Sequence, residues 1–281
     1  MTDQEMTHYA LERINELYDA GFTQENVAIK LYDGDQRQAA LIRRQFIKEH
    51  GFIDPGDTIL DSSEGEAFVP IDGRNQYLGG VLIRKLDERL TIHGLLHELS
   101  HVFCGVNEID GGGFYGRFCL NNEDTQYDGY INSGYAIWRE AIAEVMANSI
   151  YPIEQPENLG TKRMQMQIDN YKGHLKPAMP PGNNPTEKYA LSNMIDVIMN
   201  TTDVRNEIQW EELEKKLKEH DAPYLGVVEA VFRKMTEGRN VDGVLIPNYK
   251  TTPEFIATLG ETFIIEKSQA LMKMLAMGRV G

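Results

Sequence analysis

The stretch LLHELSHVF, residues 95–103, places two histidines four residues apart in an apolar segment, with a glutamate directly after the first. The chain contains only seven histidines, so two of them at this spacing in an apolar segment need an explanation. On an α-helix, residues four apart lie one turn apart on the same side, and the rings of His97 and His101 therefore converge. Burying such groups requires a partner that compensates for them.

A zinc ion is the partner that this spacing favours. Neutral imidazoles bind Zn²⁺ at about 2.0 to 2.1 Å, so His97 and His101 are predicted ligands. Glu98 lies about 100° further around the helix. There it can hydrogen-bond a water on the metal without being a ligand, which makes it the predicted general base. The alternative is a chance match, with both histidines satisfied by hydrogen bonds in the core.

His93 extends this row by another turn, but it is not a predicted ligand. It lies about 12 Å from His101 along the helix axis, too far to share one ion. Gly94 follows it where a general base would be needed. We expect His93 to support a ligand or to cap the helix, without binding the metal itself.

A third ligand is expected from the helix predicted over residues 134–150, because a catalytic zinc usually has three protein ligands and one open position. Glu140, Glu144 and Asn148 are spaced by four and share one stripe of that helix. Glu140 is the predicted ligand, and Glu144 is predicted to accept the second ring N–H of a ligating histidine. These two roles could be exchanged. Alternatively, both glutamates face solvent, paired with Arg139 or a lysine.

The rest of the chain predicts an α+β fold. Residues 4–50 carry helical periodicity, including a helix over QENVAIKLY (residues 24–32) capped by Thr23. Short apolar runs separated by Gly, Pro and Asp then predict a small mixed sheet over residues 58–85. Helical periodicity returns from about Thr91 to Gly105 and dominates the remainder, with a clear helix start at Thr252 and Pro253.

Two domains are predicted from this order. Residues 1–155 form a helical N-terminal region and a catalytic core with two active-site helices. Residues 156–281 form a mainly helical domain. The long stretch between the two active-site helices is rich in Gly, Asn and Asp, which is typical of loops that carry function.

Composition restricts the partners. A formal net charge of −15 argues against a surface built to bind nucleic acid. The chain shows no secretory signal and no run of about 18 apolar residues that would span a membrane. Its two cysteines, Cys104 and Cys119, do not form a disulfide framework. We therefore expect a cytoplasmic protein without a membrane partner.

A rival interpretation is a DNA-binding regulator. Residues 22–46 can be read as a helix-turn-helix, although the acidic chain weakens this reading. The second helix and its end would carry Arg37, Arg43, Arg44 and Lys48. A further alternative is an inactive protein that binds metal and acts as an interaction module.

The two active-site segments resemble the zincin superfamily of metallopeptidases. HELSH, residues 97–101, matches the H-E-x-x-H signature helix. REAIAE, residues 139–144, resembles the glutamate-bearing helix of the gluzincin branch, which assigns the ligand role to Glu140 and the supporting role to Glu144. The second helix also resembles zincin-type domains of antirestriction proteins and, more loosely, ImmA/IrrE-type peptidases. This resemblance covers roughly residues 58–152 and implies a zincin-like core.

The resemblance implies zinc-dependent hydrolysis of a peptide or protein. Zinc would polarise the carbonyl and lower the pKa of a water, while Glu98 would move the proton to the leaving amine. Tyr135 is the predicted donor to the oxyanion, with Tyr130 and Arg139 as alternatives. Residues 79–85, GGVLIRK, are predicted to form the sheet edge that pairs with an extended substrate.

Overall fold

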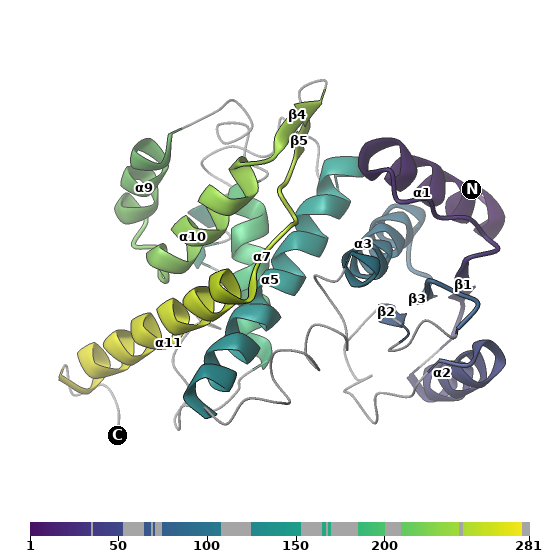
Figure 1. The fold of residues 1–281 in the computed structure, drawn as a ribbon, viewed down its shortest axis with the longest axis horizontal. Helices are drawn as coiled ribbons and strands as arrows, with labels where there is room; N and C mark the ends of the chain where they lie inside the picture. Colours follow the sequence, from purple (N-terminus) through teal and green to yellow (C-terminus); the bar gives the residue numbers. More distant parts are fainter. Residues whose placement is uncertain are drawn as a thin grey trace. The chain divides into compact units, whose positions relative to one another are not determined.

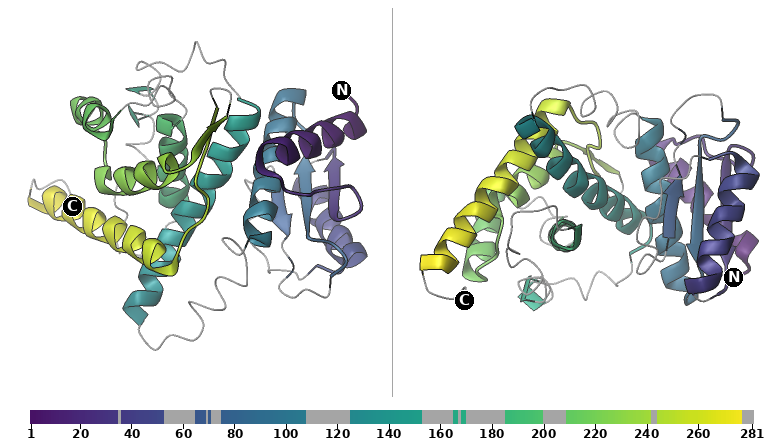
Figure 2. Two further views of the ribbon diagram at one scale, coloured as in Figure 1. Left: turned by 45° about the horizontal axis from the view of Figure 1, so that its top comes forward. Right: turned by 90° about the horizontal axis from the view of Figure 1, so that it is seen from below.

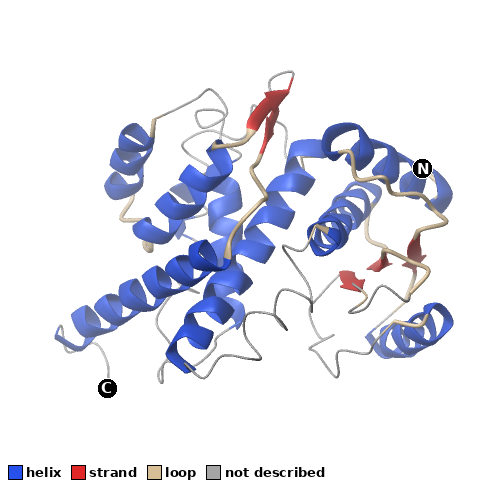
Figure 3. Ribbon diagram, in the orientation of Figure 1, coloured by secondary structure: helices blue, strands red, loops and turns tan. Residues whose placement is uncertain are grey.

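The computed structural model describes eleven ranges of the chain. They are residues 1–34, 36–52, 65–68, 70, 75–107, 125–152, 165–166, 168–169, 185–199, 209–241 and 244–276. Helices predominate in these ranges, with a small mixed sheet and one β-hairpin, so the predicted α+β class is confirmed (Figures 1 and 3). None of the described helices combines the length and the apolar character needed to cross a bilayer.

The chain divides into two compact units. The first comprises Met1–Arg117 and Met146–Ile153, and the second Phe118–Val145 and Glu154–Gly281. Helix α5 (Thr125–Ile150) contributes residues to both units. These units group residues by spatial contact and are not continuous in sequence. The predicted domain boundary at residue 155 therefore stays a prediction.

The first unit begins with α1 (Asp3–Tyr18), which is capped at both ends by local chemistry. The Thr2 hydroxyl accepts a hydrogen bond from the Glu5 backbone N–H, and the Glu5 carboxylate accepts one from the Thr2 N–H. This reciprocal capping satisfies two otherwise unpaired amides. The helix ends at Asp19, whose φ of 53° is left-handed.

The segment after α1 is a turn and a strand, so the helix predicted over residues 24–32 is wrong. The Thr23 hydroxyl accepts hydrogen bonds from the backbone N–H groups of Glu25 and Asn26, which closes a turn. Strand β1 (Val27–Tyr32) follows it directly. Each residue of this strand pairs in parallel register with a residue of another strand, Gly79–Arg84, which a helix over the same residues could not do.

The helix-turn-helix interpretation fails for the same reason, since its first helix is β1. Its second helix exists as α2 (Gln36–His50), as predicted. However, Arg43 on this helix is buried and forms an ion pair with Glu66. Arg43 is therefore not available for contacts with phosphate.

A three-stranded sheet forms the centre of the first unit. Its order is β1, β3 (Gly79–Arg84), β2 (Gly65–Phe68), with β1 parallel and β2 antiparallel to β3. The prediction that β3 is an edge for a substrate is therefore wrong, because β3 pairs on both sides. Within the described sheet, β1 and β2 are the edge strands.

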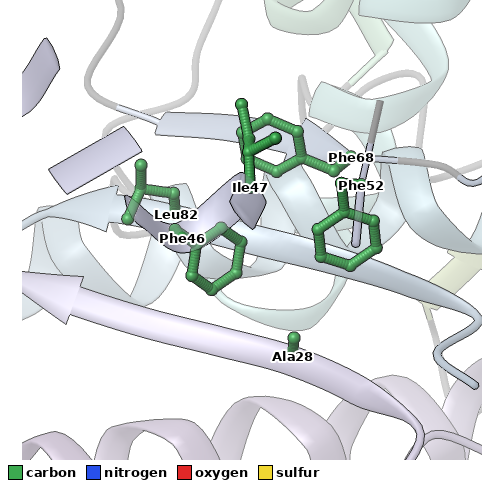
Figure 4. Close-up of a cluster of buried hydrophobic side chains, with 6 residues drawn as sticks. All are labelled: Ala28, Phe46, Ile47, Phe52, Phe68 and Leu82. Carbon is green, nitrogen blue, oxygen red and sulfur yellow. The ribbon is translucent and has the colours of Figure 1, made fainter. Parts of the chain in front are cut away.

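Helices cover both faces of this sheet. Helices α1 and α3 (Glu88–Val106) lie on one face and α2 on the other (Figures 1 and 2). The α2 face is closed by a cluster of buried apolar side chains, shown in Figure 4. The cluster consists of Ala28, Phe46, Ile47, Phe52, Phe68 and Leu82.

Helix α3, the helix of the histidine pair, begins at Glu88, slightly earlier than predicted. The Asp87 carboxylate caps it by accepting a hydrogen bond from the Leu90 N–H at 2.9 Å. The helix then passes close to the sheet, because β3 presents a glycine to it. A side chain at Gly79 would place its Cβ only 2.5 Å from Val102 of α3.

The second unit is helical apart from one hairpin. It contains part of α5, α7 (Pro185–Met199), α9 (Trp210–Glu219), α10 (Leu225–Thr236) and α11 (Pro253–Ala276), with β4 (Arg239–Val241) and β5 (Val244–Ile246). Helix α11 starts as predicted, with the Thr252 hydroxyl accepting from the Phe255 N–H. Helices α5 and α11 approach at two glycines, where an added Cβ at Gly134 or Gly260 would meet backbone of the other helix within 2 Å.

A buried ionic cluster connects three helices of this unit. Glu187 on α7 has no exposed surface, and its carboxylate accepts hydrogen bonds from the Tyr224 hydroxyl and the Lys267 ammonium. Burial, together with the hydrogen bond to Glu187, raises the pKa of the Tyr224 phenol well above its usual range. Beside the cluster, Glu266 accepts hydrogen bonds from the first N–H groups of α10 at 2.9 and 3.2 Å.

This cluster predicts a strong effect of Lys267→Met on stability. The substitution would leave the Glu187 carboxylate buried without its cationic partner, so we expect a loss of about 3 to 5 kcal/mol in the free energy of unfolding. Urea denaturation followed by circular dichroism measures this loss. Lys273→Met, at an exposed position of the same helix, is the matched control and should change stability by less than about 0.5 kcal/mol. Equal effects of the two substitutions would contradict the prediction.

Candidate metal centre

Two imidazole nitrogens of α3 converge on one point. The Nε2 atoms of His97 and His101 are 3.1 Å apart, and the two rings are nearly perpendicular with centroids 4.7 Å apart. Two nitrogens bound to one tetrahedral zinc at the usual bond length would be separated by about 3.3 Å. The observed separation is close to that value, so the pair can accommodate a zinc ion with little movement.

The same separation also fits a hydrogen bond between the rings. In that arrangement one neutral imidazole donates its N–H to the lone pair of the other. His101 is only 2% exposed, so its ring is shielded from water in either case. The distance alone is therefore compatible with both the metal and the core interpretations.

Glu98 lies on the side of α3 that faces the sheet. Its side chain is buried against the first residue of β2, and a Cβ added at Gly65 would lie 2.9 Å from the Glu98 Oε1 atom. Gly65 therefore leaves the space that the carboxylate occupies. The sequence analysis missed this residue, because a single glycine at a strand end has no spacing that connects it to the histidine helix.

Helix α5 supplies the acidic candidate. The described residues contain one group of His, Cys, Asp and Glu side chains that could hold a metal ion, namely His97, His101 and Glu140. One potential ligand atom from each lies within 4.8 Å of the others. Glu144, the alternative ligand, lies one turn later on α5 and is not in this group.

Glu140 also takes part in an ion pair. Its Oε1 atom is 3.5 Å from the Arg139 Nε atom, and the two side chains are 24% and 39% exposed. This contact was anticipated as the alternative to metal binding. A partly exposed pair of this kind contributes little, typically up to about 1 kcal/mol, so it does not hold Glu140 away from a cation.

The remaining predicted site residues lie on the same two helices. The Nδ1 atom of His93 is 3.3 Å from the carbonyl oxygen of Tyr151, just beyond the end of α5, and His93 is buried. This contact joins the start of α3 to the residue after α5. Tyr135 is half-buried on α5, as are Tyr130 and Arg139, and their role as oxyanion donors stays a prediction.

This set of donors suits zinc. Two imidazole nitrogens and one carboxylate oxygen are a usual ligand set for a catalytic zinc, which keeps a fourth position for water. The buried carboxylate of Glu98 directly follows His97, the first candidate ligand, in sequence.

Comparison of the chain with protein-family models, curated proteins and solved structures finds no match.

The geometry predicts which glutamate binds zinc. Glu140→Ala should lower zinc affinity by more than about 100-fold, because it removes a ligand atom. Glu144→Ala should lower it by no more than about 10- to 100-fold, the range for a residue that supports a ligand. Competition with a chromophoric chelator measures both affinities. His8→Ala, an exposed histidine on α1, is the control and should leave zinc affinity unchanged. A larger loss of zinc affinity for Glu144→Ala than for Glu140→Ala would show that Glu144 is the ligand and Glu140 the supporting residue.

Proposed function

We propose that this protein is a zinc-dependent metallopeptidase. In this proposal His97, His101 and Glu140 hold the zinc ion, and Glu98 is the general base. The helices that carry these residues would be the core of a zincin-like catalytic region. The resemblance of HELSH and REAIAE to zincin motifs supports the proposal.

The observation that carries the proposal is the convergence of the His97 and His101 Nε2 atoms beside a buried glutamate. A pair of core histidines would need only one hydrogen bond, and it would not need a carboxylate between them in sequence. A hydrolytic site needs all three groups, since a metal alone does not transfer a proton. The group formed with Glu140 adds the negative charge that a divalent ion favours.

In the proposed reaction, the zinc ion and the side chains of the protein have different tasks. When bound, zinc polarises the substrate carbonyl and lowers the pKa of a water. Glu98 accepts the proton from the attacking water and then donates it to the leaving amine. Tyr135 is the proposed donor to the developing oxyanion.

The proposed substrate is an extended segment of a peptide or protein. Strand β2 is the edge strand beside Glu98, so it replaces β3 as the candidate for pairing with the substrate backbone. We place the activity in the cytoplasm, because the chain has only two cysteines and no disulfide framework. A nucleic-acid substrate is not proposed, given the formal net charge of −15.

The decisive variant is Glu98→Gln. It keeps the shape of the side chain but cannot accept a proton, so we expect hydrolysis of a quenched fluorescent peptide library to fall by about 100- to 10,000-fold. Zinc content, measured by mass spectrometry of the purified protein, should remain that of the wild type. His97→Ala should lose both zinc and activity.

Glu88→Gln is the matched control, since Glu88 is an exposed glutamate at the start of the same helix. It should leave hydrolysis unchanged. A wild-type protein that binds zinc tightly but cleaves no peptide would contradict the peptidase proposal and favour a metal-binding interaction module. Absence of bound zinc after purification and reconstitution would instead support two core histidines joined by a hydrogen bond.

A further inference from the structure

Strand β2 is short and lies at an edge of the sheet, yet it forms one wall of the Glu98 site. It has four residues and pairs only with β3 among the described strands. A strand of this length has few backbone hydrogen bonds to hold it. Its position against α3 therefore depends on additional side-chain contacts.

The two faces of β2 have different neighbours. Gly65 faces α3, where an added Cβ would lie 2.9 Å from both the Cγ and the Oε1 atoms of Glu98. The next residue, Glu66, points to the opposite face, as alternation along a strand requires. There it meets Arg43 of α2, so two adjacent residues connect β2 to helices on both sides of the sheet.

A bidentate ion pair between Arg43 and Glu66 attaches β2 to α2. The Arg43 Nε and Nη2 atoms donate to the two Glu66 carboxylate oxygens at 2.7 and 2.9 Å. The side chains are 4% and 19% exposed, so this bidentate pair is largely shielded from water. The guanidinium also lies over the Phe68 ring, with 5.7 Å from its central carbon to the ring centroid.

We infer that the ion pair of Arg43 and Glu66 positions the Glu98 carboxylate. The pair fixes β2 from the α2 side, and β2 in turn places the backbone of Gly65 against the Glu98 side chain. A general base must be held in a narrow range of orientations, and displacements of about 1 Å can lower rates by about 100-fold. Arg43 is thus a positioning residue that acts through β2, and this role rests on the proposed function.

The test compares Arg43→Gln with Arg44→Gln, the exposed neighbour on the same helix. Arg43→Gln should lower peptide hydrolysis by roughly 10- to 100-fold while zinc affinity changes by less than about tenfold. In the zinc-free protein it should raise the hydrogen exchange of the β2 amides by roughly tenfold or more and remove the NOE between the Gly65 Hα and Glu98 Hγ protons. Arg44→Gln should change none of these.

Two further variants separate positioning from loss of folding. Arg43→Lys keeps the charge but loses the bidentate geometry, so it should restore hydrolysis only in part. The double variant Arg43→Gln with Glu66→Gln removes both charges together and should remain folded, with β2 still loosened. An unchanged NOE and unchanged exchange in Arg43→Gln would overturn the inference, as would a rate loss that only follows the loss of folded protein. If the wild type hydrolyses no peptide, the proposed function fails, and the NOE and exchange results alone decide whether Arg43 positions Glu98.

Discussion

The structure around α3 depends on one constraint, the burial of several polar side chains on a single helix. Glu98 and His101 are buried and His97 is half-buried, while the helix backbone already uses its own donors and acceptors. Each buried polar side chain therefore needs a partner, and the His97 and His101 rings, which lie within hydrogen-bond distance, can serve as partners for each other. Gly65 provides the space for Glu98. The sheet thus accommodates the buried carboxylate of this helix.

The contacts in the two interpretations of the histidine pair differ in their typical magnitudes. One hydrogen bond between neutral rings contributes about 1 kcal/mol, and the partly exposed contact between Arg139 and Glu140 contributes no more. Apparent binding free energies of zinc at structural peptide sites reach about 10 to 16 kcal/mol. Even a small fraction of that energy exceeds both local contacts. Under the proposed function, zinc would therefore outweigh both local contacts at this set of donors.

Local chemistry made several elements predictable from the sequence. The histidine helix, α2 and the start of α11 have clear periodicity or caps, and all three were predicted. The segment over β1 was misread because Thr23 can cap a helix as well as close a turn, and a six-residue strand offers few periods to judge. Which strand is central depends on pairing between distant segments, so the position of β3 could not be inferred from its own residues. The contacts of Glu98 with Gly65 and of Arg43 with Glu66 depend on the same pairing.

Helix α5 carries Glu140 and contributes residues to both units. Its last turns belong to the first unit, where Ser149 hydrogen-bonds the Tyr18 hydroxyl at 2.8 Å and the Tyr151 carbonyl meets His93. Glu140 lies nine residues before Ser149, which is about 13.5 Å along an unbroken helix. Contacts at the end of α5 thus fix its last residues within the first unit. His93, although not a predicted ligand, contributes to this attachment through its contact with the Tyr151 carbonyl.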